Sequence, residues 1–310
     1  MYKKILVTGG NGLVGRAIHS IQKYYPQYKF YFATREKYDL LDEEQVKQMM
    51  EDISPNYVIH AAASAGGIGK NIRKSDQQFY DNIRMNSYVI HHSHTSQVEK
   101  LIVLSSVAVF SPNLKIAQED FMHIDHPHPA FYAYGHSKRI MDIQFDSYKE
   151  KYNTQCTSLI CANIFGEADN YSIDDGHVVP ALIHKCYKAK KNNTPFEVWG
   201  DGSPYREFVY AKDIATACVK MLAPKVEMSP RVIISGDSGI QIKELVSIIC
   251  KIFDYNNVVW LTDKPKGQMR KPTSKEVFNK MFPSFRYTPL ETALGQTVQW
   301  FQKNYHKVRK

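Results

Sequence analysis

Ser106, Tyr134 and Lys138 are the residues whose types and spacing best suit proton transfer. Tyr134 and Lys138 are four residues apart, so a helix would place both side chains on one face. There the ammonium would lower the pKa of the phenol from its usual value of about 10, so that Tyr134 could exchange a proton near neutrality. We therefore predict Tyr134 as a general acid and Ser106 as a hydrogen-bond donor to a carbonyl oxygen. A tyrosine and a lysine on an ordinary amphipathic helix are the structural alternative.

A glycine-rich segment could bind a dinucleotide. TGGNGLVG, at residues 8–15, follows a strand-like run at residues 4–8 and leads into a helical pattern at residues 17–24. The glycines would permit a tight turn, a close approach of the backbone to a pyrophosphate, and close packing of helix on strand. A helix N-terminus also favours an anion. The expected cofactor-binding residues here are Gly9, Asn11, Gly12, Leu13, Val14 and Gly15; a turn that only packs is the alternative.

The end of the next strand-like run indicates which dinucleotide binds. A carboxylate there would hold both ribose hydroxyls of NAD, but the run at residues 29–34 is followed by Arg35. A guanidinium suits the 2′-phosphate of NADP, so we predict NADPH as the cofactor. A merely solvated Arg35, beside Glu36, is the alternative.

The elements that must position these residues follow a βαβ rhythm. Short β-branched runs, with helical stretches between them, occur at residues 4–8, 29–34, 57–61, 101–105 and 157–164. Unbroken apolar runs are typical of parallel strands covered on both faces. We predict an α/β fold with a doubly wound (Rossmann) parallel sheet, in which Ser106 faces the cofactor from a strand end.

The rhythm breaks after Gly166, where a smaller C-terminal lobe should begin. Strand-like residues 208–213 and 231–235 could rejoin the sheet. We expect residues 1–165 and about 206–236 to form the cofactor-binding domain, and about 166–205 and 237–310 the substrate-binding lobe.

Composition narrows the class of protein. The 310 residues are 43% hydrophobic and 23% charged, as in folded proteins. The net charge of +9 comes from scattered Lys and Arg, which suits phosphate-bearing substrates and not nucleic acid. No run approaches the ~20 apolar residues of a membrane span, so we expect no membrane and a cytoplasmic protein. The five cysteines lack CxxC spacing, so we expect reduced thiols and no metal site.

In its longer motifs the chain resembles the extended short-chain dehydrogenase/reductase family. The motifs that occur in the family's order and spacing are TGGNGLVG, HAAASAGGIG, LSSVAVFSP, YGHSK, ANIFG, GHVVPAL and VWGDGSPYREFVYAKD. It is particularly similar to the GDP-L-fucose synthase branch, the 3,5-epimerase/4-reductases of GDP-4-keto-6-deoxymannose. The resemblance implies NADPH, a homodimer formed through helices that flank the sheet, a GDP-linked 4-keto sugar between two lobes, and a place in polysaccharide biosynthesis.

The resemblance also implies further site residues. Ala61, Ala62, Ala63 and Lys138 would contact the cofactor, and Gly66, Gly67, Ile68 and Asn163 would lie near the nicotinamide or the sugar. The diphosphate site would be lined by Val179, Trp199 and Arg206. A guanidinium can bind a diphosphate through two parallel hydrogen bonds. Two alternatives stay open, a surface ion pair of Arg206 with Glu207 or Asp201 and a core position for Trp199.

One position departs from the family's pattern. Aligned without gaps from Leu104, Ser106 matches the catalytic serine and Phe110 matches a tyrosine, while Ala108 stands in place of a cysteine that moves protons at C3 and C5 with a histidine. An alanine methyl has no exchangeable proton. The histidine survives as His177, which could be a lone acid, position the substrate, or be an ordinary loop residue. Cys161 could approach the pocket or fill the core.

The leading interpretation is therefore an NADPH-dependent C4-ketoreductase of a GDP-4-keto sugar that does not epimerise C3 or C5. An upstream epimerase would then set those centres wherever the pathway needs inversion. The alternatives are a bifunctional epimerase/reductase that uses His177 and another donor, and a non-catalytic NADP-binding regulatory protein, against which the intact Ser106, Tyr134 and Lys138 argue. The sugar, hexose or heptose, deoxy or not, and the C4 configuration of the product stay open.

Overall fold

The central sheet is built from the apolar runs of the sequence. The structure, a computed structural model, describes residues 2–148, 151–152, 154–264, 269 and 272–310. Six parallel strands pair in the order β2-β1-β3-β4-β5-β9, and their bounds are β2 (Tyr28–Phe32), β1 (Lys3–Thr8), β3 (Tyr57–His60), β4 (Lys100–Ser106), β5 (Gln155–Cys161) and β9 (Arg231–Ile234). The side chains of β3 and nearly all of those of β4 are buried, because helices cover both faces of the sheet.

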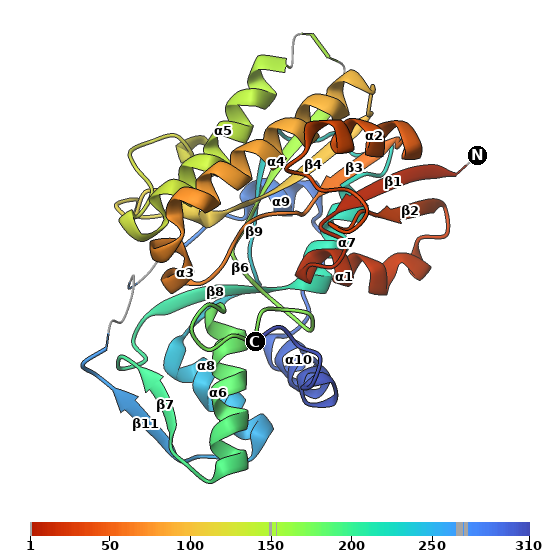
Figure 1. Cartoon of the computed structure of the whole chain (residues 1–310). Coiled ribbons are helices and arrows are strands. Elements are labelled where there is room, and N and C mark those ends of the chain that lie inside the picture. Colours follow the sequence, from red (N-terminus) through yellow and green to blue (C-terminus); the bar gives the residue numbers. More distant parts are fainter. Residues whose placement is uncertain (1, 149–150, 153, 265–268, 270–271) are drawn as a thin grey trace.

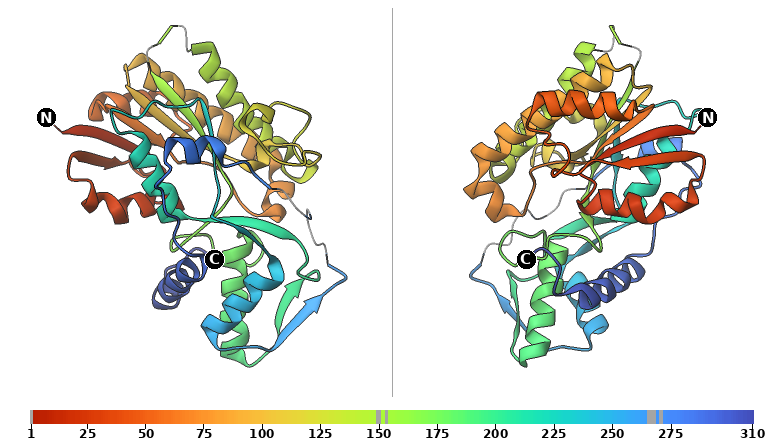
Figure 2. Two further views of the ribbon diagram at one scale, coloured as in Figure 1. Left: turned by 180° about the vertical axis from the view of Figure 1, so that it is seen from behind. Right: turned by 45° about the vertical axis from the view of Figure 1, so that its right-hand side comes forward.

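Two helical layers enclose this sheet (Figures 1 and 2). One layer contains α1 (Leu13–Ile21), α7 (Ala211–Met221) and the short α9 (Glu276–Met281). The other contains α2 (Glu43–Ile53), α4 (Ser75–Thr95) and α5 (Tyr132–Tyr148). The predicted doubly wound α/β fold is therefore confirmed.

The direction of winding changes between β1 and β3. The chain passes from β1 through α1 to β2 on one side, and returns through α2 to β3 on the other side of β1. In doubly wound sheets, ligands bind outside the carboxyl ends of the strands at such a switch point. Here those ends are joined by Thr8 Oγ1 and His60 Nδ1, which are 2.7 Å apart.

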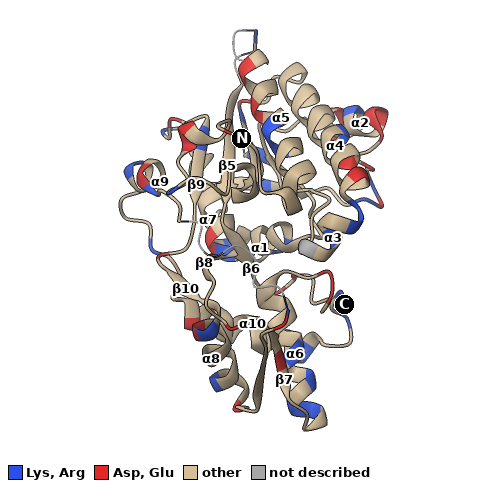
Figure 3. Cartoon of the chain, turned by 90° about the vertical axis from the view of Figure 1, so that its left-hand side faces the viewer, with Lys and Arg blue, Asp and Glu red and all other residues tan. Residues whose placement is uncertain are grey.

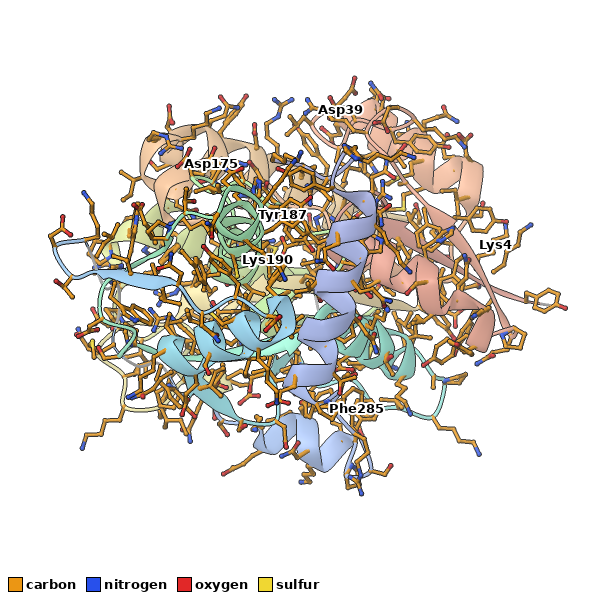
Figure 4. All side chains as sticks on the ribbon, turned by 90° about the horizontal axis from the view of Figure 1, so that it is seen from below. Lys4, Asp39, Asp175, Tyr187, Lys190 and Phe285 are labelled. Atoms are coloured by element: carbon orange, nitrogen blue, oxygen red, sulfur yellow. The ribbon has the colours of Figure 1, made fainter. Side chains whose placement is uncertain are left out.

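A smaller group of elements lies below the central sheet in Figure 1. A three-stranded sheet contains β6 (Asn163–Phe165), β8 (Tyr205–Tyr210) and β10 (Gly239–Gln241), and a two-stranded one contains β7 (Phe196–Trp199) and β11 (Val258–Leu261). The helices are α6 (Val178–Asn192), α8 (Ile242–Phe253) and α10 (Leu290–Asn304). Tyr187 and Lys190 of α6, labelled in Figure 4, contact the other two helices. The Tyr187 ring lies 5.4 Å from the Phe301 ring of α10, and Lys190 Nζ donates to the Phe253 carbonyl of α8.

Two expectations about strands are wrong. The run at residues 157–164 is not one strand. β5 ends at Cys161, and β6, which begins at Asn163, pairs with β8 outside the central sheet. Residues 208–213 do not rejoin the central sheet, because β9 already occupies the position beside β5, and α7 begins at Ala211. β9 does rejoin it, as expected. The division into two domains at the stated boundaries stays a prediction.

Short helical segments complete the chain: α3 (Ile68–Arg73), η1 (Gln22–Tyr24), η2 (Val107–Val109), η3 (Glu119–Phe121) and η4 (Pro129–Phe131). In the described ranges, no helix is long and apolar enough to cross a membrane. Figure 3 shows Lys and Arg on many separate elements, with Asp and Glu among them. The five cysteines are free thiols in this structure.

Candidate functional site

Tyr134 is brought to the end of β4 by close packing of α5 on η2. Gly135 permits this approach, since a Cβ there would lie 2.7 Å from the Ala108 carbonyl oxygen and 2.8 Å from Pro127 Cβ. Ser106 ends β4, and its Oγ accepts a hydrogen bond from the Ala108 N–H at 3.2 Å. The hydroxyl proton of Ser106 is therefore not used in this bond. The first turn of α5 thus packs against η2, which directly follows Ser106.

Lys138 lies one helical turn after Tyr134 and is 1% exposed. Its Nζ donates to the Leu104 carbonyl at 3.0 Å, and burial lowers its pKa to about 8. Burial, followed by the nearby Lys138 ammonium, lowers the pKa of His60 to about 3. Lys138 is thus a cation held between the ends of β3 and β4.

The expected lowering of the Tyr134 pKa by Lys138 is wrong for this structure. Burial, and secondarily Cys161, raises the pKa of Tyr134 above its ordinary value. The physical reason is that desolvation disfavours the phenolate, while the Lys138 ammonium is bonded to Leu104. Tyr134 is consequently held in its protonated form, the form that a proton donor needs.

The glycine segment forms an open cradle at the switch point. Gly9 has a φ of +68°, and a Cβ there would lie 2.8 Å from the Ala62 nitrogen. A Cβ on Gly15 would lie 2.3 Å from the Gly9 carbonyl oxygen. At Gly12, the N-cap of α1, a Cβ would meet only the Gly9 carbonyl oxygen, at 3.1 Å, and no side chain caps the helix. The N–H groups in the first turn of α1 are therefore not capped by a side chain, which suits an anion.

The other predicted residues of this segment differ in exposure. Asn11 and Leu13 line a cavity of about 420 Å³ beside α1. Val14 is 6% exposed and packs in the core, so only its backbone could contact a ligand.

The segment after β3, which holds Ala61, Ala62 and Ala63, is fixed by polar residues that the sequence reasoning missed. Asn82 Oδ1 accepts from the Ser64 N–H, and its Nδ2 donates to the Ser64 carbonyl, both at 2.9 Å. Asn86 Oδ1 lies 3.0 Å from His60 Nε2. Gln78, Asn82 and Asn86 are buried on one face of α4 at intervals of four residues, and this spacing is the signal that could have revealed them.

Two guanidinium groups stand near the glycine segment. Gly10 N–H donates to the Ala33 carbonyl at 2.9 Å, which brings the turn close to the loop that carries Arg35. The Arg35 side chain is 77% exposed, and its Nη2 lies 3.5 Å from Asp39 Oδ2. Such an exposed pair is weak, so Arg35 can exchange its partner. Arg16, which the sequence reasoning missed, donates from Nε to the Asn11 carbonyl at 3.1 Å.

The predicted sugar-side residues lie around α3 and β6. Gly67 is the N-cap of α3, and the side chain of Lys70 covers Gly66. The side chain of Ile68 lies outside the described part of the chain. Asn163 begins β6 and donates from Nδ2 to the Glu207 carbonyl at 2.8 Å.

The structure decides both alternatives at the predicted diphosphate site. Arg206 has no carboxylate partner among the described residues; it donates to the Tyr205 carbonyl, and burial lowers its pKa. Trp199 is 53% exposed, with Lys185 Nζ 5.2 Å from its ring centroid, so it is not core. Val179 is 2% exposed in the core of the smaller lobe, which excludes its side chain as a lining group and leaves only its backbone.

Comparison with known proteins shows which family the chain belongs to. The family model described as the NAD dependent epimerase/dehydratase family matches residues 5–234. The chain belongs to this family. It is 34% identical to a GDP-L-fucose synthase of Dictyostelium discoideum, over 99% of this chain and 98% of that protein.

Two solved structures share the fold of this family member. A GDP-L-fucose synthetase from Naegleria fowleri bound to NADP has a TM-score of 0.93 and 35% identity, with 99% of this chain and 95% of that chain covered. A GDP-6-OMe-4-keto-L-xylo-heptose reductase from C. jejuni has a TM-score of 0.86, with 98% of each chain covered. The identity to the latter is 19%, so that likeness concerns the fold alone. The resemblance inferred from the motifs is confirmed.

In this member of the epimerase/dehydratase family, three residues were considered as acids or bases for the sugar carbons C3 and C5. Ala108 lies in η2 directly after Ser106. Cys161 is 1% exposed, its Sγ contacts the Leu159 carbonyl, and burial raises its pKa well above the ordinary value, so it is a core thiol. His177 is exposed as the N-cap of α6.

A buried carboxyl near His177 was also missed. Asp169 is 7% exposed, and its Oδ2 has no hydrogen-bond partner among the described residues. Burial raises the pKa of Asp169, and His177 acts on it in the opposite direction. Its place in the polar stretch after Gly166 gave no periodic signal, because loops have none.

Proposed function

We propose that this protein reduces the C4 carbonyl of a GDP-4-keto sugar, a deoxyhexose or a heptose, without changing C3 or C5. The chain is an NADP-dependent oxidoreductase that acts on nucleotide sugars. The narrower activity rests on one observation, the alanine at position 108 beside an otherwise complete set of Ser106, Tyr134 and Lys138.

The residues of the β4–α5 corner suit ketone reduction. NADPH, when bound, supplies the hydride. Tyr134, which burial keeps protonated, donates the proton to the oxygen that becomes the C4 hydroxyl. The Ser106 hydroxyl donates a hydrogen bond to the same oxygen, and the buried Lys138 supplies positive charge beside it.

The cofactor is held at the switch point. The open cradle at Gly12 and the free N-terminus of α1 fit a pyrophosphate, since a side chain there would fill the space a phosphate needs. Arg35 is exposed and only weakly paired, so it can turn to a 2′-phosphate.

Epimerisation at C3 or C5 needs a base on one face of the sugar and an acid on the other. Ala108 can be neither, and the buried Cys161 stays a thiol because its pKa is raised. His177 alone cannot readily serve both faces. An upstream enzyme that epimerises the keto sugar would then act wherever inversion is required.

The sugar nucleotide would be held by groups of the smaller lobe. Burial takes the Arg206 guanidinium out of water, and no carboxylate among the described residues pairs with it, so an anionic diphosphate would compensate its charge. Trp199 offers an exposed ring, and Asn163 lies at the start of β6. We assign these three side chains to nucleotide-sugar binding.

We also propose a cytoplasmic homodimer formed through α4 and α5. These two helices pack side by side and expose Tyr80, Ile140 and Ile143, which are 57%, 39% and 55% exposed. An apolar patch on paired helices is typical of an interface. Sedimentation equilibrium of the protein with Ile143→Glu should then show a monomer, against a dimer for the parent chain.

The activity is tested with GDP-4-keto-6-deoxymannose and NADPH. Absorbance of the reduced nicotinamide should fall, and NMR of the product should show a C4 hydroxyl with C3 and C5 unchanged. A product inverted at both carbons would instead support the bifunctional epimerase/reductase. That second candidate is favoured by Asp169, a buried carboxyl that interacts electrostatically with His177.

A further inference from the structure

The loop at residues 166–177 leads from β6 to α6, two elements of the smaller part of the molecule, and contacts the cofactor side on its way. Its first half is fixed to the smaller part: Tyr171 is fully buried, its OH donates to the Gly166 carbonyl at 3.2 Å, and its N–H donates to the Arg309 carbonyl at 2.9 Å. Its last residue, His177, is the N-cap of α6. The residues between these points contact a different element, α3.

The contact with α3 is made by backbone and side chain together. Gly67 N–H donates to the Asp175 carbonyl at 2.9 Å, and Arg73 Nη2 forms an ion pair with Asp175 Oδ1. The fit is close, because a Cβ on Gly67 would lie 2.4 Å from the Gly176 carbonyl oxygen. Asp175 thus binds both ends of α3, at its N-cap and at its last residue.

α3 is itself held firmly at the contact. Asn71 is 5% exposed, and its Nδ2 donates to the Gly66 carbonyl at 2.7 Å and the Gly67 carbonyl at 2.9 Å. These bonds hold the first turn of α3 at the point where the loop contacts it. Figure 4 labels Asp175 on this loop, near the ribbon of the N-terminal half.

We propose that Arg73 and Asp175 are positioning residues that dock the loop on α3 and so fix His177 for contact with the sugar. This rests on the proposed function. His177 is exposed, and its side chain makes no capping hydrogen bond to α6. Its place is set by α6 on one side and by the docked Asp175 and Gly176 on the other. Neither Arg73 nor Asp175 needs to touch the reacting atoms.

The contact of Asp175 with Arg73 and Gly67, called the dock below, differs from ordinary surface ion pairs in the elements that it joins. Lys3 and Glu99 form a pair of similar exposure, but Lys3 begins β1 and Glu99 directly precedes β4, so this pair joins two neighbouring parts of the central-sheet domain. Arg73 and Asp175 join a helix of the cofactor side to the loop of the smaller part, where a sugar nucleotide would be enclosed. Loss of the Arg73–Asp175 pair should therefore weaken binding of the sugar nucleotide, while loss of the Lys3–Glu99 pair should leave that binding unchanged.

The kinetic test uses Arg73→Gln, Asp175→Asn and the charge exchange Arg73→Asp with Asp175→Arg, with Lys3→Gln as the matched control. For GDP-4-keto-6-deoxymannose, each single variant should raise KM about three-fold, the scale of an exposed ion pair, with KM for NADPH unchanged. The charge exchange should restore most of the loss. In a His177→Ala background, Arg73→Gln should have no further effect, because both changes act through the same side chain.

Amide hydrogen exchange provides a readout without turnover. The Gly67 N–H should exchange faster in Arg73→Gln than in the parent protein and in Lys3→Gln. Unchanged exchange, or faster exchange with an unchanged KM for the sugar nucleotide, would overturn the proposal. If the parent protein leaves the keto sugar unreduced, the proposed function fails separately. The dock is then judged by calorimetry with GDP-mannose, whose Kd should rise about three-fold in Arg73→Gln; an equal Kd rejects it.

Discussion

The corner between β4 and α5 and the loop at residues 166–177 differ in how they hold their functional groups. At the corner, Lys138 is fully buried. α5 packs so closely on η2 at Gly135 that there is no room for a side chain. In the loop, His177 is exposed and depends on an exposed ion pair between Arg73 and Asp175. The corner is therefore rigid by packing, while the loop is held by weak, reversible contacts.

This difference separates two kinds of function. Groups that move a proton to C4 must be fixed to within a fraction of an ångström, and a packed strand end provides this. Groups that choose the sugar can lie on a loop, where substitution changes specificity without disturbing the sheet. On the proposed function, the alanine at position 108 in η2 removes the epimerisation chemistry, while Ser106, Tyr134 and Lys138 keep the reduction.

The largest expected effect is at the corner. Tyr134→Phe removes the proton donor but keeps the ring, so kcat should fall at least ~10²-fold while NADPH and the sugar nucleotide still bind. Steady-state kinetics together with calorimetric titration of NADPH would measure both. Near-normal turnover would place the donor elsewhere, on a water or on His177, and the contrast between the two regions would be lost.

The next effect is a pH dependence set by Lys138. Burial lowers the pKa of this ammonium to about 8, while the pKa values of Tyr134 and Cys161 are raised, so these two stay protonated there. The useful charge is present below pH 8 and lost above it. With NADPH as the varied substrate, kcat/KM should be level up to about pH 7.5 and then fall about tenfold per pH unit. A profile that stays level through pH 9 contradicts this assignment.

Local sequence patterns could be predicted, while contacts between elements distant in sequence could not. The glycine segment, the strand ending at Ser106 and the spacing of Tyr134 and Lys138 are local patterns, so they predicted the fold and the elements that carry these residues. The bond from Lys138 to the Leu104 carbonyl and the docking of Asp175 on Arg73 depend on elements distant in sequence. The pairing of β8 with β6, and of β9 with β5, likewise joins elements that are distant in sequence.

A smaller effect is expected at the edge of the cofactor cradle. Arg35→Gln should reduce the preference for NADPH over NADH about tenfold, because a charge-assisted hydrogen bond to the 2′-phosphate is lost. Arg286→Gln is the matched control, since its exposed guanidinium bonds the Phe285 carbonyl and is not part of the glycine segment. The ratio of kcat/KM for the two cofactors measures the effect. An unchanged ratio in Arg35→Gln would show that Arg35 is merely solvated.

The central claim, reduction without epimerisation, is tested most directly by the fate of the protons at C3 and C5. The reaction is run in D2O with unlabelled NADPH and GDP-4-keto-6-deoxymannose, and deuterium in the product is located by NMR. Because Ala108 leaves no second acid or base opposite His177, the product should carry no more deuterium at C3 and C5 than a control without enzyme. Rapid incorporation at either carbon that is abolished by His177→Ala would contradict the claim and establish the bifunctional enzyme instead.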